Sequence, residues 1–324
     1  MLDILISEEL DSPAIQKLSA KYKVVRDGRL WQDPAKLKMA IAEVRAILVR
    51  NQTQLTAEIL AAASRLIGIG RVGVGLDNID LPAASKAGIV VIAPLEANAT
   101  SVAELTLAFL LALARKIPQA DRSTKAGGWD RKGCTGIELE GKTLAICGFG
   151  RIGRRVALLA RAFGMKSLVF DPFVKPNSPS LAETGASLAN TLEEVLAVSD
   201  FVTTHSPLTP ETRRMFNAAA FTLMKPGAFF INTSRGGVVD EAALLEALRS
   251  GHLGGAALDV REKEPPGERT GLEQMDNVIL APHIGAFTAE SQTRTFEAVA
   301  TDVDRLLSGE PAINFVNMAR PART

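Results

Sequence analysis

The sequence predicts an α/β protein with two doubly wound parallel sheets. Short runs rich in Val, Ile, Leu and Phe alternate with segments of helical periodicity, which is typical of sheets covered by helices on both faces. These runs form two series separated by a long apolar helical segment. The chain has 324 residues, which exceeds the usual size of one hydrophobic core. We therefore expect two domains.

Each run has the length and composition of a buried strand. The first series occupies residues 3–7, 23–27, 46–50, 66–70 and 89–94. The second series occupies residues 143–148, 167–171, 201–205, 228–234, 256–260 and 278–283. Each series predicts one parallel sheet.

Two long helices are expected on either side of the second series. The first covers residues 100–120, with Thr100 or Ser101 as its N-cap. The second covers residues 288–310 and ends at Gly309. Because the chain ends soon afterwards, we expect this second helix to return to the first domain.

The first domain is then discontinuous and encloses the second. Its expected residues are 1–98 and 287–324, and those of the enclosed domain are 99–286. Short connections through the two long helices would join the domains.

Composition and charge exclude several classes of protein. The net charge is +1 with no long block of one sign, so we expect neither a nucleic-acid nor a membrane partner. The longest apolar run is shorter than the roughly 20 residues that span a bilayer, and the first residues lack a signal-peptide pattern. Cys134 and Cys147 are too few for a disulfide framework, and no Cys/His cluster has metal-ligand spacing. These features predict a cytoplasmic enzyme without a metal.

The clearest chemical signal is the turn that follows residues 143–148. Gly148, Gly150 and Gly153 have the spacing G-x-G-x-x-G, and the next strand ends in Asp171, 18 residues after Gly153. The glycines alone would also fit an ordinary bend between a strand and a helix. Together with the strand, the helix and the acidic residue, they predict a dinucleotide site of the Rossmann type. There the pyrophosphate meets the helix N-terminus and the carboxylate binds the ribose.

Asp171 also indicates which dinucleotide binds. A carboxylate accepts hydrogen bonds from ribose hydroxyls and repels the 2′-phosphate of NADP. The adjoining residues FDPF offer no arginine to reverse this preference, so we predict NAD as the cofactor. Arg151 is a candidate phosphate contact, and its alternative role is a solvated charge on the first helical turn.

A dehydrogenase needs a proton acceptor, and histidine suits this role near neutral pH. His252 follows a helix end, where it caps carbonyl groups or faces water. His205 ends a strand, and its preferred role is a hydrogen-bonded residue of the nucleotide site. His283 ends the last strand of the second series, at the sheet edge where ligands of open α/β proteins bind. We therefore predict His283 as the base.

The base needs a carboxylate that orients it. If the substrate is a 2-hydroxy acid, its carboxylate also needs a cationic partner. Glu264 follows the preceding strand, with Glu262 and Asp259 as alternatives that spacing alone does not separate. Arg235 lies between a strand and two glycines, where its planar guanidinium can hold a carboxylate with two hydrogen bonds. Its alternative role is a surface arginine in a glycine turn.

Seven segments, taken in order, resemble the D-isomer-specific 2-hydroxyacid dehydrogenases over essentially the whole chain. They are RVGVGLDNIDLPAASKAGIVV, NATSVAELT, GKTLAICGFGRIGRRVA, HSPLTPET, MKPGAFFINTSRGGVVDEAALLEAL, GAALDVREKEP and APHIGAFT. The resemblance implies a Rossmann domain inserted into a flavodoxin-like substrate domain. It also implies that Arg235, Glu264 and His283 are the catalytic residues, and so selects Glu264 over Glu262.

The resemblance further implies two sets of binding residues. Beside the three motif glycines, the NAD set comprises Val74, Arg151, Ile152, Asp171, Thr204, Pro207, Thr233, Ser234, Asp259, His283 and Gly285. The substrate set comprises Arg50, Arg71, Val72, Gly73, Val74, Asn98, Arg131, Arg235 and His283. Within it, the residues 72–74 can present backbone N–H groups to an anion.

Among the subfamilies, the chain is most similar to the 3-phosphoglycerate dehydrogenases. Arg50, Arg71 and Arg131 match positions around the substrate phosphate there, so this resemblance implies oxidation of 3-phosphoglycerate in serine biosynthesis. The resemblance to the family also implies a homodimer. The alternatives are a hydroxypyruvate or glyoxylate reductase, another dehydrogenase of anionic 2-hydroxy acids, and a NAD-responsive scaffold protein.

Two features depart from the subfamily pattern. The chain ends at VNMARPART, so we expect a short form without C-terminal regulatory domains. In the segment VREKEP, Arg261 stands where the family usually has an aromatic residue, so we expect the wall of that loop to differ.

Overall fold

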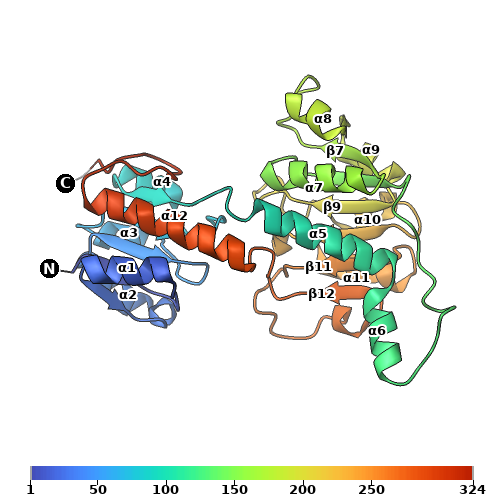
Figure 1. Cartoon of the computed structure of the whole chain (residues 1–324), viewed down its shortest axis with the longest axis horizontal. Coiled ribbons are helices and arrows are strands. Elements are labelled where there is room, and N and C mark those ends of the chain that lie inside the picture. Colours follow the sequence, from blue (N-terminus) through green and yellow to red (C-terminus); the bar gives the residue numbers. More distant parts are fainter. Residues whose placement is uncertain (1, 323–324) are drawn as a thin grey trace. The chain divides into compact units, whose positions relative to one another are not determined.

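The computed structural model describes residues 2–322. They divide into unit 1, with residues 2–98 and 286–322, and unit 2, with residues 99–285. Each unit is built on a parallel sheet with helices packed against it (Figure 1). The predicted fold class is therefore confirmed. Within residues 2–322, no helix combines the length and the apolar character that crossing a membrane requires.

Unit 1 contains a five-stranded sheet within its described residues. The strand order β2-β1-β3-β4-β5 is that of a flavodoxin-like fold. The strands are β1 (Ile4–Ile6), β2 (Val24–Arg26), β3 (Ala46–Val49), β4 (Gly68–Arg71) and β5 (Val90–Ile92). The helices are α1 (Pro13–Lys21), η1 (Leu30–Gln32), α2 (Pro34–Ala42), α3 (Ala57–Ala62), α4 (Leu81–Lys86) and α12 (Ala289–Leu307).

Helix α12 closes one face of this sheet, and Figure 1 shows it in red beside α1 in blue. Its side chains pack directly on β4, where a Cβ at Gly70 would crowd Val299 and Val303. Glycine in the strand therefore permits the close approach of the helix. The helix ends before Gly309, whose φ of +84° is the left-handed conformation expected after a C-terminus.

Unit 2 contains a seven-stranded sheet in the order β12-β11-β10-β9-β6-β7-β8, so the direction of winding reverses between β6 and β9. The strands are β6 (Thr143–Cys147), β7 (Lys166–Phe170), β8 (Ser187–Leu188), β9 (Phe201–Thr204), β10 (Phe229–Asn232), β11 (Gly255–Leu258) and β12 (Val278–Leu280). The helices are α5 (Ala99–Ala114), α6 (Ile117–Lys125), α7 (Arg151–Ala162), α8 (Pro179–Thr184), α9 (Leu192–Val198), α10 (Ala218–Leu223), η2 (Gly236–Val238), α11 (Glu241–Arg249) and η3 (Leu272–Gln274).

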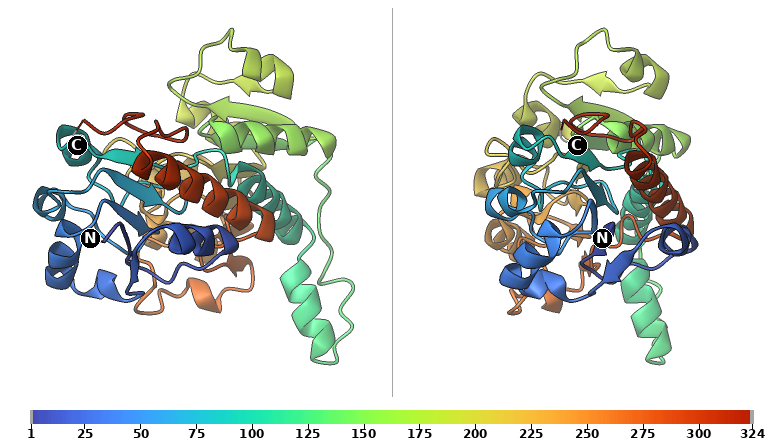
Figure 2. Two further views of the ribbon diagram at one scale, coloured as in Figure 1. Left: turned by 60° about the vertical axis from the view of Figure 1, so that its left-hand side comes forward. Right: turned by 90° about the vertical axis from the view of Figure 1, so that its left-hand side faces the viewer.

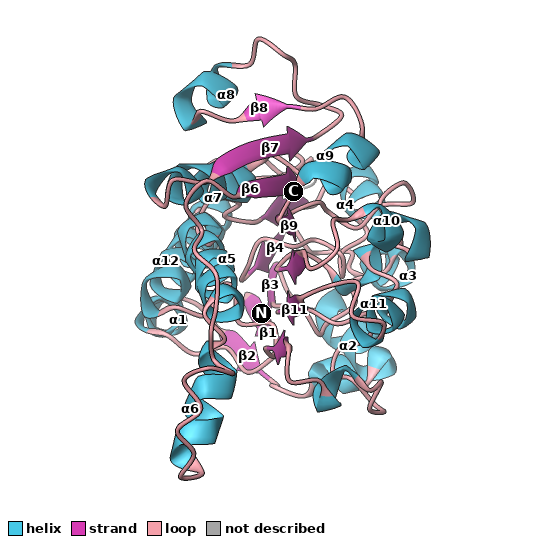
Figure 3. Ribbon diagram, turned by 90° about the vertical axis from the view of Figure 1, so that its right-hand side faces the viewer, coloured by secondary structure: helices cyan, strands magenta, loops and turns pink. Residues whose placement is uncertain are grey.

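Two apolar cores lie on opposite faces of this sheet. Figure 3 shows α5 and α7 on one side of the strands and α9, α10 and α11 on the other. Leu110 and Val156 belong to the first core, and Phe221 and Leu244 belong to the second. Both faces are thus covered, as the continuous apolar strands predict.

The first long helix differs from the prediction in two respects. It begins at Ala99, so neither Thr100 nor Ser101 is its N-cap. It also stops at Ala114, and the chain turns through Lys116, with a φ of 52°, into α6. Pro118 has no N–H to donate to the carbonyl oxygen of Ala114, which instead accepts the N–H of Ile137 at 2.8 Å. Figure 2 shows α6 projecting from the rest of unit 2.

Candidate active site

The glycine turn connects the end of β6 to the start of α7. Gly148 has a φ of +95°, a conformation that favours glycine. A Cβ at Gly153 would overlap the carbonyl oxygen of Gly148, whereas a Cβ at Gly150 would meet nothing within 4 Å. The three glycines therefore provide a tight turn, open space before the helix N-terminus and close packing of the helix on the turn. This cradle fits the pyrophosphate of a dinucleotide.

Asp171 is held beside the glycine turn at the end of β7. One carboxylate oxygen accepts the N–H of Phe149 at 2.7 Å, and the other accepts the N–H of Phe173 at 2.9 Å. A carboxylate offers about four lone pairs, so both oxygens retain capacity for ribose hydroxyls. The acidic residue is thus oriented before any ligand binds.

Most of the other predicted cofactor residues gather at the carboxyl ends of neighbouring strands. Thr204 ends β9, Thr233 and Ser234 follow β10, Asp259 follows β11 and Gly285 follows β12. Ile152 lies on the first turn of α7 beside the exposed Arg151, and Pro207 is exposed in the loop after β9. Val74 lies in unit 1. The carboxyl ends of the strands, on either side of the switch in winding, are where α/β proteins bind ligands.

His205 and His252 have the structural surroundings that the sequence predicts for them. The ring of His205 contacts the hydroxyls of Thr203 and Thr233 at 3.2 and 3.5 Å, and burial lowers its pKa to about 3. A ring that stays neutral in this way suits a structural hydrogen-bonding role. His252 contacts the carbonyl oxygen of Phe221 through Nε2 at 3.0 Å.

His283 and Glu264 form a close pair. The Nδ1 atom of His283 lies 2.7 Å from Oε2 of Glu264, and Oε1 of Glu264 accepts the N–H of Arg261 at 3.0 Å. Burial by itself raises the pKa of Glu264, but the bonds from His283 and Arg261 and the charge of Arg235 bring it below its ordinary value. The carboxylate is therefore ionised, and the Nε2 atom of the ring is the one left to face a substrate.

The backbone around His283 is shaped by Asp259. His283 has a φ of 57°, which is uncommon for a residue with a side chain. Its N–H donates to the carbonyl oxygen of Asp259 at 2.7 Å, and the N–H groups of Ile284 and Gly285 donate to the Asp259 carboxylate at 2.7 and 2.8 Å. These bonds hold the turn that presents the imidazole, so Asp259 supports the turn while Glu264 contacts the ring.

Arg235 follows β10 and precedes η2. Its Nη1 atom donates to the carbonyl oxygen of Ser234 at 2.7 Å, and its own carbonyl oxygen accepts from the Asn232 amide at 2.9 Å. The next residue, Gly236, packs so closely that a Cβ would overlap the carbonyl group of Arg261. The turn of Arg235 is thus packed against the loop that carries Glu264.

In unit 1, the guanidinium of Arg50 is held in one orientation. Its Nη2 atom donates to Gln292 at 2.7 Å, and its Cζ lies 4.3 Å from the centre of the Phe287 ring. Buried Glu8 accepts the backbone N–H of Arg50 at 2.8 Å. Sequence reasoning missed Gln292, Phe287 and Glu8, because nothing local in the sequence links them to Arg50.

The remaining predicted substrate residues have diverse surroundings. Arg71 is buried and folds over its own loop, where its Nη1 atom donates to the carbonyl oxygen of Val72 at 3.0 Å and fills the space beside Gly73. Asn98 is half-buried at the end of the first segment of unit 1. Arg131 is exposed in unit 2, after α6.

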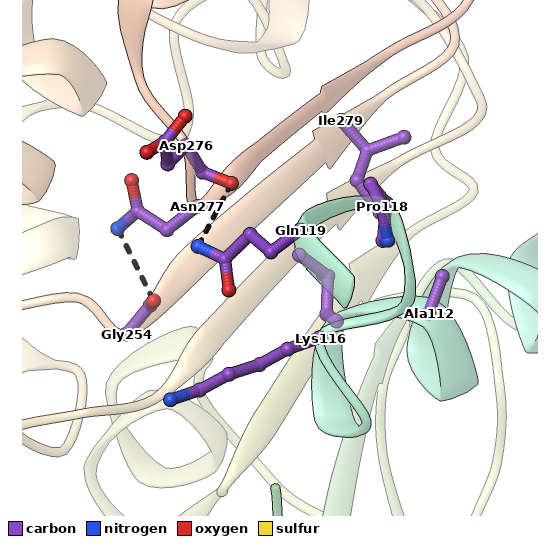
Figure 4. A pocket seen from close by; sticks show the side chains of 9 residues that line it. Ala112, Lys116, Pro118, Gln119, Gly254, Asp276, Asn277 and Ile279 are labelled. Atoms are coloured by element: carbon purple, nitrogen blue, oxygen red, sulfur yellow. Dashed lines mark hydrogen bonds between the residues drawn. The ribbon is translucent and has the colours of Figure 1, made fainter. Parts of the chain in front are cut away.

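A pocket of about 50 Å³ lies elsewhere in unit 2, between the α5–α6 junction and β12 (Figure 4). Gln119 donates to the carbonyl oxygen of Asp276 at 3.2 Å, and Asn277 donates to that of Gly254 at 3.2 Å. The lining residues include none of the predicted site residues. The pocket is therefore separate from the predicted cofactor site.

Residues 107–285 match the family model for the NAD binding domain of the D-isomer specific 2-hydroxyacid dehydrogenases. The chain belongs to this family. The matched segment contains the glycine turn, Asp171, Arg235, Glu264 and His283, so unit 2 is the family's NAD-binding domain.

Individual relatives agree with the family assignment. The chain is 43% identical to D-3-phosphoglycerate dehydrogenase of Methanocaldococcus jannaschii over 319 aligned residues. This alignment covers 98% of the chain and 60% of that protein. The chain thus spans less than two thirds of the length of that relative.

Two solved structures are similar to this chain over nearly their full lengths. The TT0316 protein of Thermus thermophilus is similar with a TM-score of 0.89 and 34% identity, over 97% of this chain and 100% of that one. The D-lactate dehydrogenase of Aquifex aeolicus, complexed with NAD and lactic acid, is similar with a TM-score of 0.88 and 32% identity, over 97% and 99%. The predicted family and the predicted cofactor NAD are confirmed, and the roles of individual site residues stay predictions.

Proposed function

We propose that the chain is a NAD-dependent dehydrogenase that oxidises 3-phosphoglycerate, a phosphorylated D-2-hydroxy acid, to phosphohydroxypyruvate, for serine biosynthesis. The observation that carries the proposal is the 2.7 Å contact between His283 and Glu264, at the strand ends that also bear the glycine turn. The name of the Methanocaldococcus relative supports the choice of substrate.

The proposed chemistry follows from three side chains. Arg235 binds the substrate carboxylate and stabilises charge on the reacting oxygen. His283 accepts the hydroxyl proton at Nε2, and Glu264 stabilises the imidazolium that results. When bound at the glycine turn and Asp171, NAD supplies the acceptor for the hydride from C2. In the opposite direction His283 returns its proton to the oxygen, as a general acid.

Unit 1 supplies the proposed anion contacts. Arg50 binds the substrate phosphate, and the loop of residues 72–74 binds its carboxylate. Contrary to the expectation for this loop, the N–H groups of Val72 and Gly73 already donate to the carbonyl oxygens of Val49 and Arg71 at 2.8 and 2.9 Å, so we propose the N–H of Val74 as the donor. The stacked and hydrogen-bonded guanidinium of Arg50 supports this role, because a side chain already ordered loses less entropy on binding. Arg71, Asn98 and Arg131 complete the proposed substrate set.

The substrate is tested by following NADH absorbance with a panel of acids. The panel contains 3-phosphoglycerate with phosphohydroxypyruvate, then hydroxypyruvate, glyoxylate, and D-lactate with pyruvate. We expect a preference for the phosphorylated pair that Arg50→Ala removes. Preference for an unphosphorylated acid would place the chain among the other reductases of the family. Tight NADH binding without turnover would instead indicate a scaffold protein.

The base is tested by His283→Asn, with His252→Asn as the same change elsewhere in unit 2. Positioned acid–base catalysis contributes about 10²–10⁴-fold, so we expect a loss of that size in kcat for His283→Asn only. NADH affinity, measured by fluorescence titration, should stay near that of the wild type. Retained turnover in His283→Asn would show that another residue is the base.

We also propose a cytoplasmic homodimer. Apolar side chains exposed around α6, namely Ile117 and Trp129 at 54% and 80%, support an interface on unit 2. The free cysteines Cys134 and Cys147 are compatible with a reducing compartment. Light scattering should give twice the 34.5 kDa mass of the chain, and a monomeric mass would reject the dimer.

A further inference from the structure

A buried ion cluster lies beside the loop that carries Glu264, and none of its members was among the predicted site residues. Arg261 is its centre, with 8% of its side chain exposed. It lies in the loop that follows β11. This loop therefore places a set of charges inside the protein.

The guanidinium of Arg261 joins three segments of unit 2. Its Nε and Nη2 atoms donate to the two carboxylate oxygens of Glu241, the first residue of α11, at 3.0 and 2.9 Å. Its Nη1 and Nη2 atoms also donate to Glu273 in η3 and to Thr270, both at 3.0 Å. The planar guanidinium is thus bonded to Glu241 on one side and to Glu273 and Thr270 on the other. The bidentate pair with the Glu241 carboxylate defines its orientation as well as its distance.

The backbone of Arg261 carries that orientation to the catalytic residues. Its N–H donates to Oε1 of Glu264 at 3.0 Å, which leaves Oε2 directed at the His283 ring 2.7 Å away. Its carbonyl group packs against Gly236, next to Arg235. The following N–H, of Glu262, also bonds to Glu241, at 2.7 Å. Displacement of Arg261 would therefore move the acceptor that contacts His283.

Stability alone does not account for such a cluster. Removing one cation and two carboxylates from water carries a large desolvation cost, and buried ion pairs are often replaceable by apolar groups without loss of stability. The charged cluster offers direction, because the five N–H groups of arginine lie in one rigid plane.

We propose that Arg261 is a positioning residue, which fixes Glu264 for its contact with His283 through the Glu241–Glu273 cluster. The proposal rests on the proposed dehydrogenase function.

Arg261→Met tests it, because methionine is apolar and similar in length. Arg214→Met is the matched control, since Arg214 pairs with the neighbouring Glu262 at 2.8 Å on the surface and touches none of the catalytic residues. We expect Arg261→Met to lower kcat by about 10-fold and by no more than Glu264→Gln does, because a displaced Glu264 loses at most its own hydrogen bond to His283. NADH affinity in both variants, and kcat in Arg214→Met, should stay within about twofold of the wild type.

A double-mutant cycle separates positioning from general destabilisation. If Arg261 acts through Glu264, then adding Arg261→Met to a Glu264→Gln chain changes kcat by less than about twofold. Effects that multiply in the double variant, or equal kcat in Arg261→Met and Arg214→Met, would overturn the proposal. Both of these results would leave the wild-type enzyme active, so the proposed function would stand. A wild type without turnover on any acid of the substrate panel would overturn the proposed function and this proposal together.

A second variant is needed in case Arg261→Met does not fold, because removing Arg261 alone leaves the carboxylates of Glu241 and Glu273 without their cation. Arg261→Met combined with Glu241→Gln and Glu273→Gln removes the whole cluster of charges, and glutamine keeps an acceptor for the N–H of Glu262. We expect a folded chain, by circular dichroism, that has lost kcat to a similar degree. A folded triple variant with wild-type kcat would refute the positioning role.

Discussion

Glu264→Gln removes one charge and one hydrogen-bond acceptor from the candidate site while preserving shape. In the wild type, Oε1 accepts the N–H of Arg261 and Oε2 contacts Nδ1 of His283. Glutamine has a single oxygen, so one of these two contacts loses its acceptor. If the oxygen stays with Arg261, the amide N–H₂ faces Nδ1, which must then be unprotonated. The neutral ring would carry its proton on Nε2 and could not accept one from the substrate.

The size of the effect follows from the bond that is lost. Hydrogen bonds to charged groups contribute about 1.5–3 kcal/mol, which corresponds to about a 10- to 150-fold loss in kcat. The side chains of His283 and Glu264 are 41% and 34% exposed, so we expect a loss in the lower half of that range. The assay is the initial rate of NADH formation at saturating NAD and hydroxy acid.

Glu262→Gln is the control for this prediction, because Glu262 was the alternative that spacing could not exclude. Its carboxylate pairs with Arg214 on the surface, where an ion pair contributes little. We expect kcat within about twofold of the wild type. Wild-type kcat in Glu264→Gln, or an equal loss in both variants, would refute the assignment of the carboxylate.

Two further predictions concern the cofactor and acid stability. Asp171→Ala should raise the KM for NAD by about 10- to 150-fold through lost hydrogen bonds to a charged group, and should raise the KM for NADP less, because the carboxylate no longer repels the 2′-phosphate. An equal rise for both cofactors would contradict the proposed ribose contact. For Glu273, burial raises the pKa but hydrogen bonds from the backbone and Arg261 outweigh it and bring the pKa to about 2, below the ordinary 4.5. The stabilisation by Glu273 is therefore complete above pH 4.5 and is lost as the pH falls towards 2. Between pH 4.5 and about 2, the thermal unfolding temperature of Glu273→Gln should therefore fall less than that of the wild type. Parallel pH profiles of the two unfolding temperatures would contradict this prediction.

Local patterns were sufficient for the sheets and for the cofactor. Strands buried on both faces read as continuous apolar runs, and the turn of Gly148 and Gly153 has steric requirements that only glycine meets. The misplaced start and end of α5 are local errors too. Pro118 was visible in the sequence, and its missing N–H is enough to explain the break near Lys116.

The choice among carboxylates shows where local patterns stop. Glu262 and Glu264 are two residues apart in the same loop, and only the folded chain directs one to Arg214 and the other to His283. From the sequence, that choice came from resemblance to the family, since spacing left it open.

The sequence by itself determined the parallel sheets and the NAD-binding turn, and it predicted the candidate base, because each depends on neighbours along the chain or on a strand end. Only the tertiary structure decided which partners surround Arg50 and Arg261. Gln292 lies 242 positions from Arg50, and Glu241 and Glu273 lie 20 and 12 positions from Arg261. Contacts of this kind arise when separate elements pack together, and no periodicity in the chain records them.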